Sequence, residues 1–64
     1  MPMVQITMLE GRTLEQKRKL AERITDALEE AGAPREGVAI AFHEVSKENY
    51  ALGGVLRVDK GKQP

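Results

Sequence analysis

The sequence has no cysteine and no tryptophan, and Phe42 and Tyr50 are its only aromatic residues. Without cysteine, disulfide bonds and thiolate zinc sites are excluded, and the single histidine, His43, excludes a histidine-rich metal site within one chain. A chain of 64 residues buries only roughly 60% of the surface that it exposes when unfolded, so domains of this size usually need additional stabilisation. Because disulfides and such metal sites are excluded, we expect the chain to self-associate.

Neither sign of charge is in excess, since ten Lys and Arg residues balance ten Asp and Glu residues. This balance argues against nucleic acid and anionic membranes as partners. No apolar run approaches the ~20 residues of a membrane-spanning helix, and no basic segment followed by an apolar one indicates a secretory signal. We therefore expect a cytoplasmic protein with a single domain over residues 1–64, in which residues 59–64 form a frayed tail.

One amphipathic helix is predicted over residues 14–31. Thr13 and Gln16 match a capping box, in which each side chain binds a backbone amide at the start of a helix. Gly32 suits the residue after the last turn, and Pro34 cannot continue the helix. Helix carboxylates are expected only to solubilise the exposed face. The apolar stripe consists of Leu20, Ala21, Ile24, Ala27, Leu28 and Ala31, which recur at three- and four-residue steps.

Strands are predicted on both sides of this helix. Residues 3–9 and 38–45 alternate side chains with period two, and strand, helix and strand make a β-α-β unit with parallel strands and a right-handed crossover. After a polar turn at residues 46–49, residues 50–58 form a short β-hairpin around Gly53-Gly54. One helix covers a single face of the two-stranded sheet, and the hairpin is too short to be stable alone. The open sheet face and the short hairpin of this α+β architecture therefore predict oligomerisation, as the small size of the chain does.

Pro2 is the main candidate for chemistry, because the sequence contains no cysteine nucleophile, GxSxG, phosphate-binding glycine loop or HExxH motif. A small residue after Met1 permits removal of the methionine, which would leave Pro2 with a free secondary amine. Amino termini titrate far below lysine, and apolar surroundings and a nearby cation such as Arg12 would lower the pKa further. An amine that is neutral near pH 7 suits proton transfer. Alternatively, Pro2 only begins a strand.

The residues after Pro2 resemble the 4-oxalocrotonate tautomerase family. Residues 2–13, Pro-Met-Val-Gln-Ile-Thr-Met-Leu-Glu-Gly-Arg-Thr, are similar to the signature Pro-x-x-x-Ile-x-x-Leu-Glu-Gly-Arg-Ser/Thr. The Ala33-Pro34 corner and the segment Tyr50-Ala-Leu-Gly-Gly also fall at the family's positions, so the resemblance spans residues 2–58. It implies β-α-β subunits with a C-terminal hairpin, assembled as a hexamer that is a trimer of dimers.

The resemblance also implies an activity and roles for three residues. It implies a cofactor-free isomerase in which Pro2, as general base, moves a proton between the dienol oxygen and a distal carbon of an unsaturated 2-hydroxy or 2-oxo acid. Arg12 matches an arginine that binds the distal carboxylate, a role that suits a bidentate guanidinium. Tyr50 matches an aromatic position, usually Phe, that keeps the surroundings of the proline apolar. The alternative for Tyr50 is simple packing within the hairpin.

Ala39 departs from the family pattern, which has at this position a second arginine contributed by an adjacent subunit. Losing a charged hydrogen bond to substrate ordinarily costs about 1.5–3 kcal/mol. Three compensations are open: Arg35 or His43 reaches the site, a companion chain supplies the arginine in a hetero-oligomer, or the substrate differs. Two further functions are also open. The Pro2 amine could act in iminium, hydratase or dehalogenase chemistry, or the chain could be a non-catalytic assembly subunit.

Overall fold

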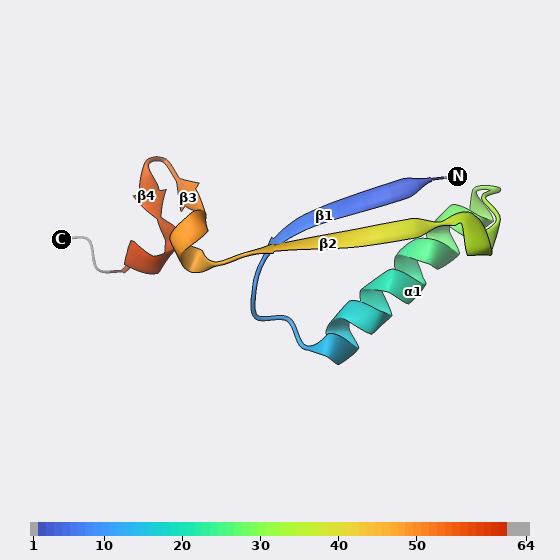
Figure 1. The fold of residues 1–64 in the computed structure, drawn as a ribbon, viewed down its shortest axis with the longest axis horizontal. Coiled ribbons are helices and arrows are strands. Elements are labelled where there is room, and N and C mark those ends of the chain that lie inside the picture. Colours follow the sequence, from blue (N-terminus) through green and yellow to red (C-terminus); the bar gives the residue numbers. More distant parts are fainter. Residues whose placement is uncertain (1, 62–64) are drawn as a thin grey trace.

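A computed structural model describes residues 2–61 as a β-α-β unit followed by a β-hairpin, which confirms the predicted α+β fold (Figure 1). Strands β1 and β2 pair in parallel, and strands β3 and β4 pair antiparallel. The elements are β1 (Met3–Leu9), α1 (Leu14–Glu30), β2 (Ala39–Val45), β3 (Ala51–Leu52) and β4 (Val55–Leu56). Strand β2 begins one residue later than predicted, because a 3-10 turn over Arg35–Gly37 precedes Val38.

The sheet of β1 and β2 has one covered and one open face. Residues paired across the two strands point to the same side, so Ile6 and its partner Phe42 share a face, and both are half-buried. Ile6 lines a cleft together with Leu20 of α1, so this is the face on which the helix lies, and Figure 1 shows α1 running alongside the two strands. On the opposite face, Thr7 and its partner His43 are exposed. The parallel pairing and the bulky and small faces of β2 therefore follow the prediction.

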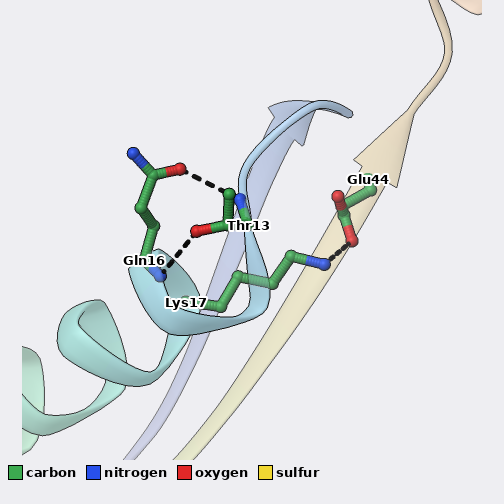
Figure 2. Close-up of polar contacts among 4 residues, drawn as sticks. All are labelled: Thr13, Gln16, Lys17 and Glu44. Atoms are coloured by element: carbon green, nitrogen blue, oxygen red, sulfur yellow. Dashed lines mark hydrogen bonds and ion pairs between the residues drawn. The ribbon is translucent and has the colours of Figure 1, made fainter.

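The predicted capping box is present at the start of α1 (Figure 2). The Gln16 backbone amide donates to Thr13 Oγ1 at 3.1 Å, and the Thr13 amide donates to Gln16 Oε1 at 2.9 Å. One residue further, the Lys17 ammonium pairs with the Glu44 carboxylate on β2. These contacts set where α1 begins and hold its first turn against the C-terminal end of β2.

The predicted end of the helix is confirmed, but the apolar stripe needs a correction. Gly32 follows the capping residue Ala31 with a φ of 107°, a left-handed conformation that glycine adopts without steric cost. Of the predicted stripe, Ala27 and Ala31 are exposed, because Ala27 lies at the edge of the stripe with only a methyl group and Ala31 lies beyond the last turn. The half-buried members are Leu20, Ala21, Ile24 and Leu28.

The hairpin turns at Gly53-Gly54 as predicted, with φ values of 60° and 84°, the left-handed pair that a primed two-residue turn requires. Its second arm was predicted to run to Val58, and this is wrong. The arm ends at Leu56, because residues Arg57–Asp59 close a 3-10 turn in which the Lys60 amide donates to the Arg57 carbonyl at 3.1 Å. The predicted frayed tail falls partly on residues 62–64, which lie outside the described residues.

A single subunit has no closed hydrophobic core. Within residues 2–61 no hydrophobic side chain is fully buried, and Met3 and Leu52 are 64% and 71% exposed. The radius of gyration is 15.7 Å, whereas a compact chain of this length has about 11 Å. The hairpin lies at one end of an elongated subunit of 51 × 23 × 14 Å (Figure 1). Among the described residues, no helix is long and apolar enough to cross a membrane.

Candidate active site

Pro2 lies at the end of the sheet where β1 and β2 begin. Its carbonyl oxygen accepts a hydrogen bond from the Ala39 amide at 3.0 Å, and the residue is half-buried. Proline has no amide hydrogen to donate to a strand, so its place before the first residue of β1 leaves the ladder intact. Met1, whose removal amine chemistry at Pro2 requires, lies outside the described residues.

Arg12 lies at the opposite end of the sheet from Pro2 of the same chain. The seven residues of β1 separate the two, and at ~3.3 Å per residue this strand alone spans about 20 Å. Arg12 then follows the turn at Gly11, which has a φ of 126°. The expectation that Arg12 is the cation near Pro2 is therefore wrong within a single chain. The structure does not bring these two side chains together in one subunit.

Arg12 stands at an open cleft of about 460 Å³ between β1 and α1. Ile6 and Met8 of β1 and Leu20 of α1 supply its apolar lining. The polar lining consists of Arg12, Gln16, Lys19 and Arg23. A cationic rim over an apolar surface suits an organic acid, whose carboxylate pairs with a guanidinium while its carbon skeleton leaves water.

Lys19 and Arg23 were not anticipated as neighbours of Arg12. They lie four residues apart on α1 and therefore on one side of the helix, together with Gln16. The spacing was visible in the sequence. What it did not indicate is that this side of α1 borders the same cleft as the loop residue Arg12.

Tyr50 lies at the same end of the sheet as Arg12. It lines a cavity of about 470 Å³ with Leu9 of β1 and residues of the hairpin, and the Arg57 amide donates to its carbonyl oxygen at 2.8 Å. A smaller cavity of about 180 Å³ joins Tyr50 to Met8 and Val45. Tyr50 as a whole residue is 40% exposed. Tyr50 therefore both lines a pocket and packs within the hairpin. It lies at the other end of the sheet from Pro2 of its own chain.

Ala39 stands at the family's second arginine position and has no charged side chain; its backbone amide lies beside Pro2 of the same chain. It pairs with Met3 across the sheet and is exposed on the open face. His43 lies further along the same face opposite Thr7, so it does not approach Pro2 of its own chain. Within residues 2–61, no three His, Asp or Glu side chains gather where they could hold a metal ion.

Arg35 is held against the end of α1. Its guanidinium donates to Asp26 Oδ1 at 2.7 Å and to Glu29 Oε1 at 3.0 Å, and these hydrogen bonds raise the pKa of Arg35 above its usual range. Asp26 and Glu29 were expected only to solubilise the helix, and this is wrong, because both anchor the turn over Arg35–Gly37 from which β2 begins. The same contacts direct the Arg35 guanidinium toward α1.

Comparison with known proteins shows which family the chain resembles. The model of the family described as tautomerase enzyme matches residues 2–60. A 2-hydroxymuconate tautomerase from Comamonas testosteroni is 48% identical over 63 residues, covering 97% of this chain and all of that protein. A solved 4-oxalocrotonate tautomerase isozyme from Methylibium petroleiphilum is 49% identical, with a TM-score of 0.86 and coverage of 94% of this chain and 98% of that chain. A heterohexamer 4-oxalocrotonate tautomerase from Chloroflexus aurantiacus is 35% identical, with a TM-score of 0.85 and coverage of 92% and 97%.

Proposed function

The chain belongs to the family of tautomerase enzymes, which are isomerases, and from this premise we propose that it interconverts the enol and keto forms of an unsaturated 2-hydroxy or 2-oxo acid. The general base is the amine of Pro2 after removal of Met1, and Arg12 binds a carboxylate of the substrate. Base catalysis by an amine needs no cofactor. We also propose that the 64 residues form a single tautomerase domain.

The proposed reaction is a proton transfer without change of oxidation state. The neutral Pro2 nitrogen takes the proton from the enol oxygen, and the electron pair moves through the conjugated system. The resulting ammonium then returns a proton to a distal carbon, so the amine is regenerated. Arg12 orients the substrate through its carboxylate and stabilises the negative charge that develops during transfer. The apolar lining by Ile6, Met8 and Leu20 makes this electrostatic stabilisation stronger than it would be in water.

We propose that the complete site forms between two subunits, because one subunit separates Pro2 from Arg12. Strand β1 pairs with β2 along one edge, and its other edge has no partner within the described sheet. Antiparallel pairing of this edge about a two-fold axis at Ile6, the middle residue of β1, would bring Pro2 opposite Glu10 of the second subunit. Arg12 of that subunit follows two residues later. Three such pairs would form the hexamer that the family resemblance implies.

The observation that carries this proposal is the position of Arg12, over an apolar lining and beside the unpaired edge of β1. Tyr50 at the same end of the sheet would close the assembled site with an aromatic ring. Ala39 carries no charge at the position where the family resemblance implies a second arginine, which supports a substrate that needs one carboxylate clamp, so we expect an enol monoacid to be preferred to a dienol diacid. The alternative is a hetero-oligomer in which a companion chain supplies the second arginine. It stays open because one of the structural neighbours is a heterohexamer.

The test is ketonisation of the enol of phenylpyruvate by protein whose intact mass confirms loss of Met1. We expect Pro2→Ala to abolish the activity and Arg12→Ala to lower it by roughly 10- to 100-fold, the effect of losing one charge-assisted hydrogen bond. Arg18→Ala is the matched control, because Arg18 is an exposed arginine of α1 that does not line the Arg12 cleft.

An active protein that retains Met1 would refute the amine mechanism, because the Pro2 nitrogen is then an amide. An unchanged rate in Pro2→Ala, which keeps a primary amine, would refute the need for the secondary amine of proline. Complete inactivity of the correctly processed protein would favour a non-catalytic subunit or a missing companion chain. Borohydride trapping of an aldehyde on Pro2 would instead indicate the alternative iminium chemistry.

A further inference from the structure

Arg57 is a half-buried cation that has no carboxylate partner among the described residues of the subunit. It follows β4 at the start of the 3-10 turn over Arg57–Asp59, and it takes part in none of the ion pairs within residues 2–61. The guanidinium of Arg35, by contrast, binds two carboxylates of α1. A guanidinium carries five hydrogen-bond donors, so the position of Arg57 favours an anion or a polarised oxygen as its partner.

The backbone holds Arg57 beside Tyr50. The Arg57 amide donates to the Tyr50 carbonyl oxygen at 2.8 Å, and both residues line the cavity of about 470 Å³, which we call the hairpin cavity. Leucine and valine residues of the hairpin and Leu9 of β1 give this cavity its apolar lining. Its two cationic residues are Arg57, which is half-buried, and Lys60, which is exposed. An apolar cavity with a half-buried guanidinium suits an organic acid.

The hairpin cavity is linked through shared residues to the Arg12 cleft. It shares Leu9 and Tyr50 with the cavity of about 180 Å³, and that smaller cavity shares Met8 with the Arg12 cleft. The three spaces therefore follow one another from the hairpin to α1, at the end of the sheet that faces the hairpin (Figure 1). Arg57 lies on the hairpin side of this series and Arg12 on the helix side.

The proposed reaction has one substrate oxygen without a hydrogen-bond donor of its own. Arg12 binds the carboxylate, whereas negative charge develops on the neighbouring 2-hydroxy oxygen when Pro2 removes its proton. A donor aimed at this oxygen stabilises the charge where it forms. The family resemblance implies a second arginine, but its position holds Ala39, whose methyl group has no donor.

We propose that Arg57 is a further substrate-binding residue, whose guanidinium donates to the 2-hydroxy or 2-oxo oxygen and supplies the donor that Ala39 does not. The inference rests on the proposed function. No bond to Arg57 forms or breaks, because the guanidinium stays protonated and stabilises the enolate while Pro2 carries the proton. The site therefore selects 2-oxo and 2-hydroxy acids over carboxylic acids that lack this oxygen.

Arg57 fits this role better than the two residues that the sequence offered as compensation for Ala39. The guanidinium of Arg35 is bound to α1. His43 lies on the open face of the sheet opposite Thr7, and neither His43 nor Arg35 lines any of the three spaces. Arg57 is instead bonded to Tyr50, whose ring the family resemblance places among the surroundings of the proline.

The experiment measures equilibrium binding of two acids by titration calorimetry, using protein from which Met1 has been removed. Benzoylformate carries a 2-oxo oxygen but has no hydrogen to enolise, and phenylacetate keeps the ring and the carboxylate but lacks that oxygen. Arg57→Gln is expected to raise the dissociation constant of benzoylformate by roughly 10-fold or more, as loss of a charge-assisted hydrogen bond does, and that of phenylacetate much less. Arg57→Lys is expected to recover part of the benzoylformate affinity, because it keeps the charge but not the planar donors.

Arg18→Gln is the matched control, since it removes the same charge from an exposed arginine that lines none of the three spaces. It is expected to leave both dissociation constants unchanged. A ratio of the two constants in Arg57→Gln equal to the parental ratio would overturn the proposal. An equal loss of both ligands would give the parental ratio as well, and would assign Arg57 a structural role. The ratio is measured without turnover, so it tests Arg57 separately from the activity that tests Pro2.

Discussion

A mixture of one inactive variant and one weakened variant is expected to regain activity, because the proposed site takes Pro2 from one chain and Arg12 from another. Pro2→Ala and Arg12→Ala chains would be unfolded together in equal amounts and refolded. The reasoning rests on β1, whose seven residues span about 20 Å. No arginine side chain crosses this distance, so a single chain carrying both residues cannot complete the site alone.

The recovered fraction follows from counting pairs. If chains pair at random, about half of the two-fold pairs contain one chain of each variant, and each mixed pair has one site with both residues and one with neither. About one quarter of all sites is therefore intact, and the same fraction holds in any larger assembly of such pairs. Ketonisation of the enol of phenylpyruvate measures this recovery against parental protein refolded in parallel.

The matched control refolds Pro2→Ala with the double variant Pro2→Ala/Arg12→Ala, a mixture in which no site carries both residues. It is expected to stay inactive. A recovery near one quarter in the first mixture and none in the control would support a site shared between chains. Activity in the first mixture that does not exceed the sum of its separately refolded components would refute the shared site.

Three further predictions concern the fold. Thr13→Ala removes one half of the capping box and is expected to lower the free energy of unfolding by about 1 kcal/mol in urea titrations; an unchanged midpoint would contradict a stabilising cap. Gly54→Ala is expected to cost about 1–2 kcal/mol through backbone strain, because φ is 84° while an added Cβ meets no atom within 4 Å; thermal unfolding measures this, and a stabilised variant would speak against the turn. Arg35→Met is expected to lower stability by an amount that stays constant between about pH 6 and 10, because hydrogen bonds to Asp26 and Glu29 raise the pKa of Arg35, and a raised pKa delays the loss of charge to more alkaline pH. A destabilisation that vanished on moving from pH 6 to 10 would be inconsistent with this.

Much of the fold could be predicted because its signals lie within a few residues of one another. Period-two alternation indicated β1 and β2, and the three- and four-residue steps indicated α1. Thr13 and Gln16 located the start of the helix to the residue, since a capping box is a contact over three positions. The hairpin was predicted over residues 50–58 from Gly53-Gly54, which located its turn but not the ends of its arms, because the strands cover only Ala51–Leu52 and Val55–Leu56 and the backbone turns again at Arg57–Asp59.

The sequence by itself determined the kinds of local element, their order and the family signature that contains Pro2 and Arg12. Only the tertiary structure decided how these elements combine. It placed Arg12 at the far end of β1 from Pro2, brought Lys19 and Arg23 to the Arg12 cleft, and bound Arg35 to α1. Side-chain spacing along a chain gives the face on which a residue lies. The distance between two such faces depends on how the strands and the helix pack against each other. In this small subunit the surfaces also remain open, since no hydrophobic side chain among the described residues is fully buried.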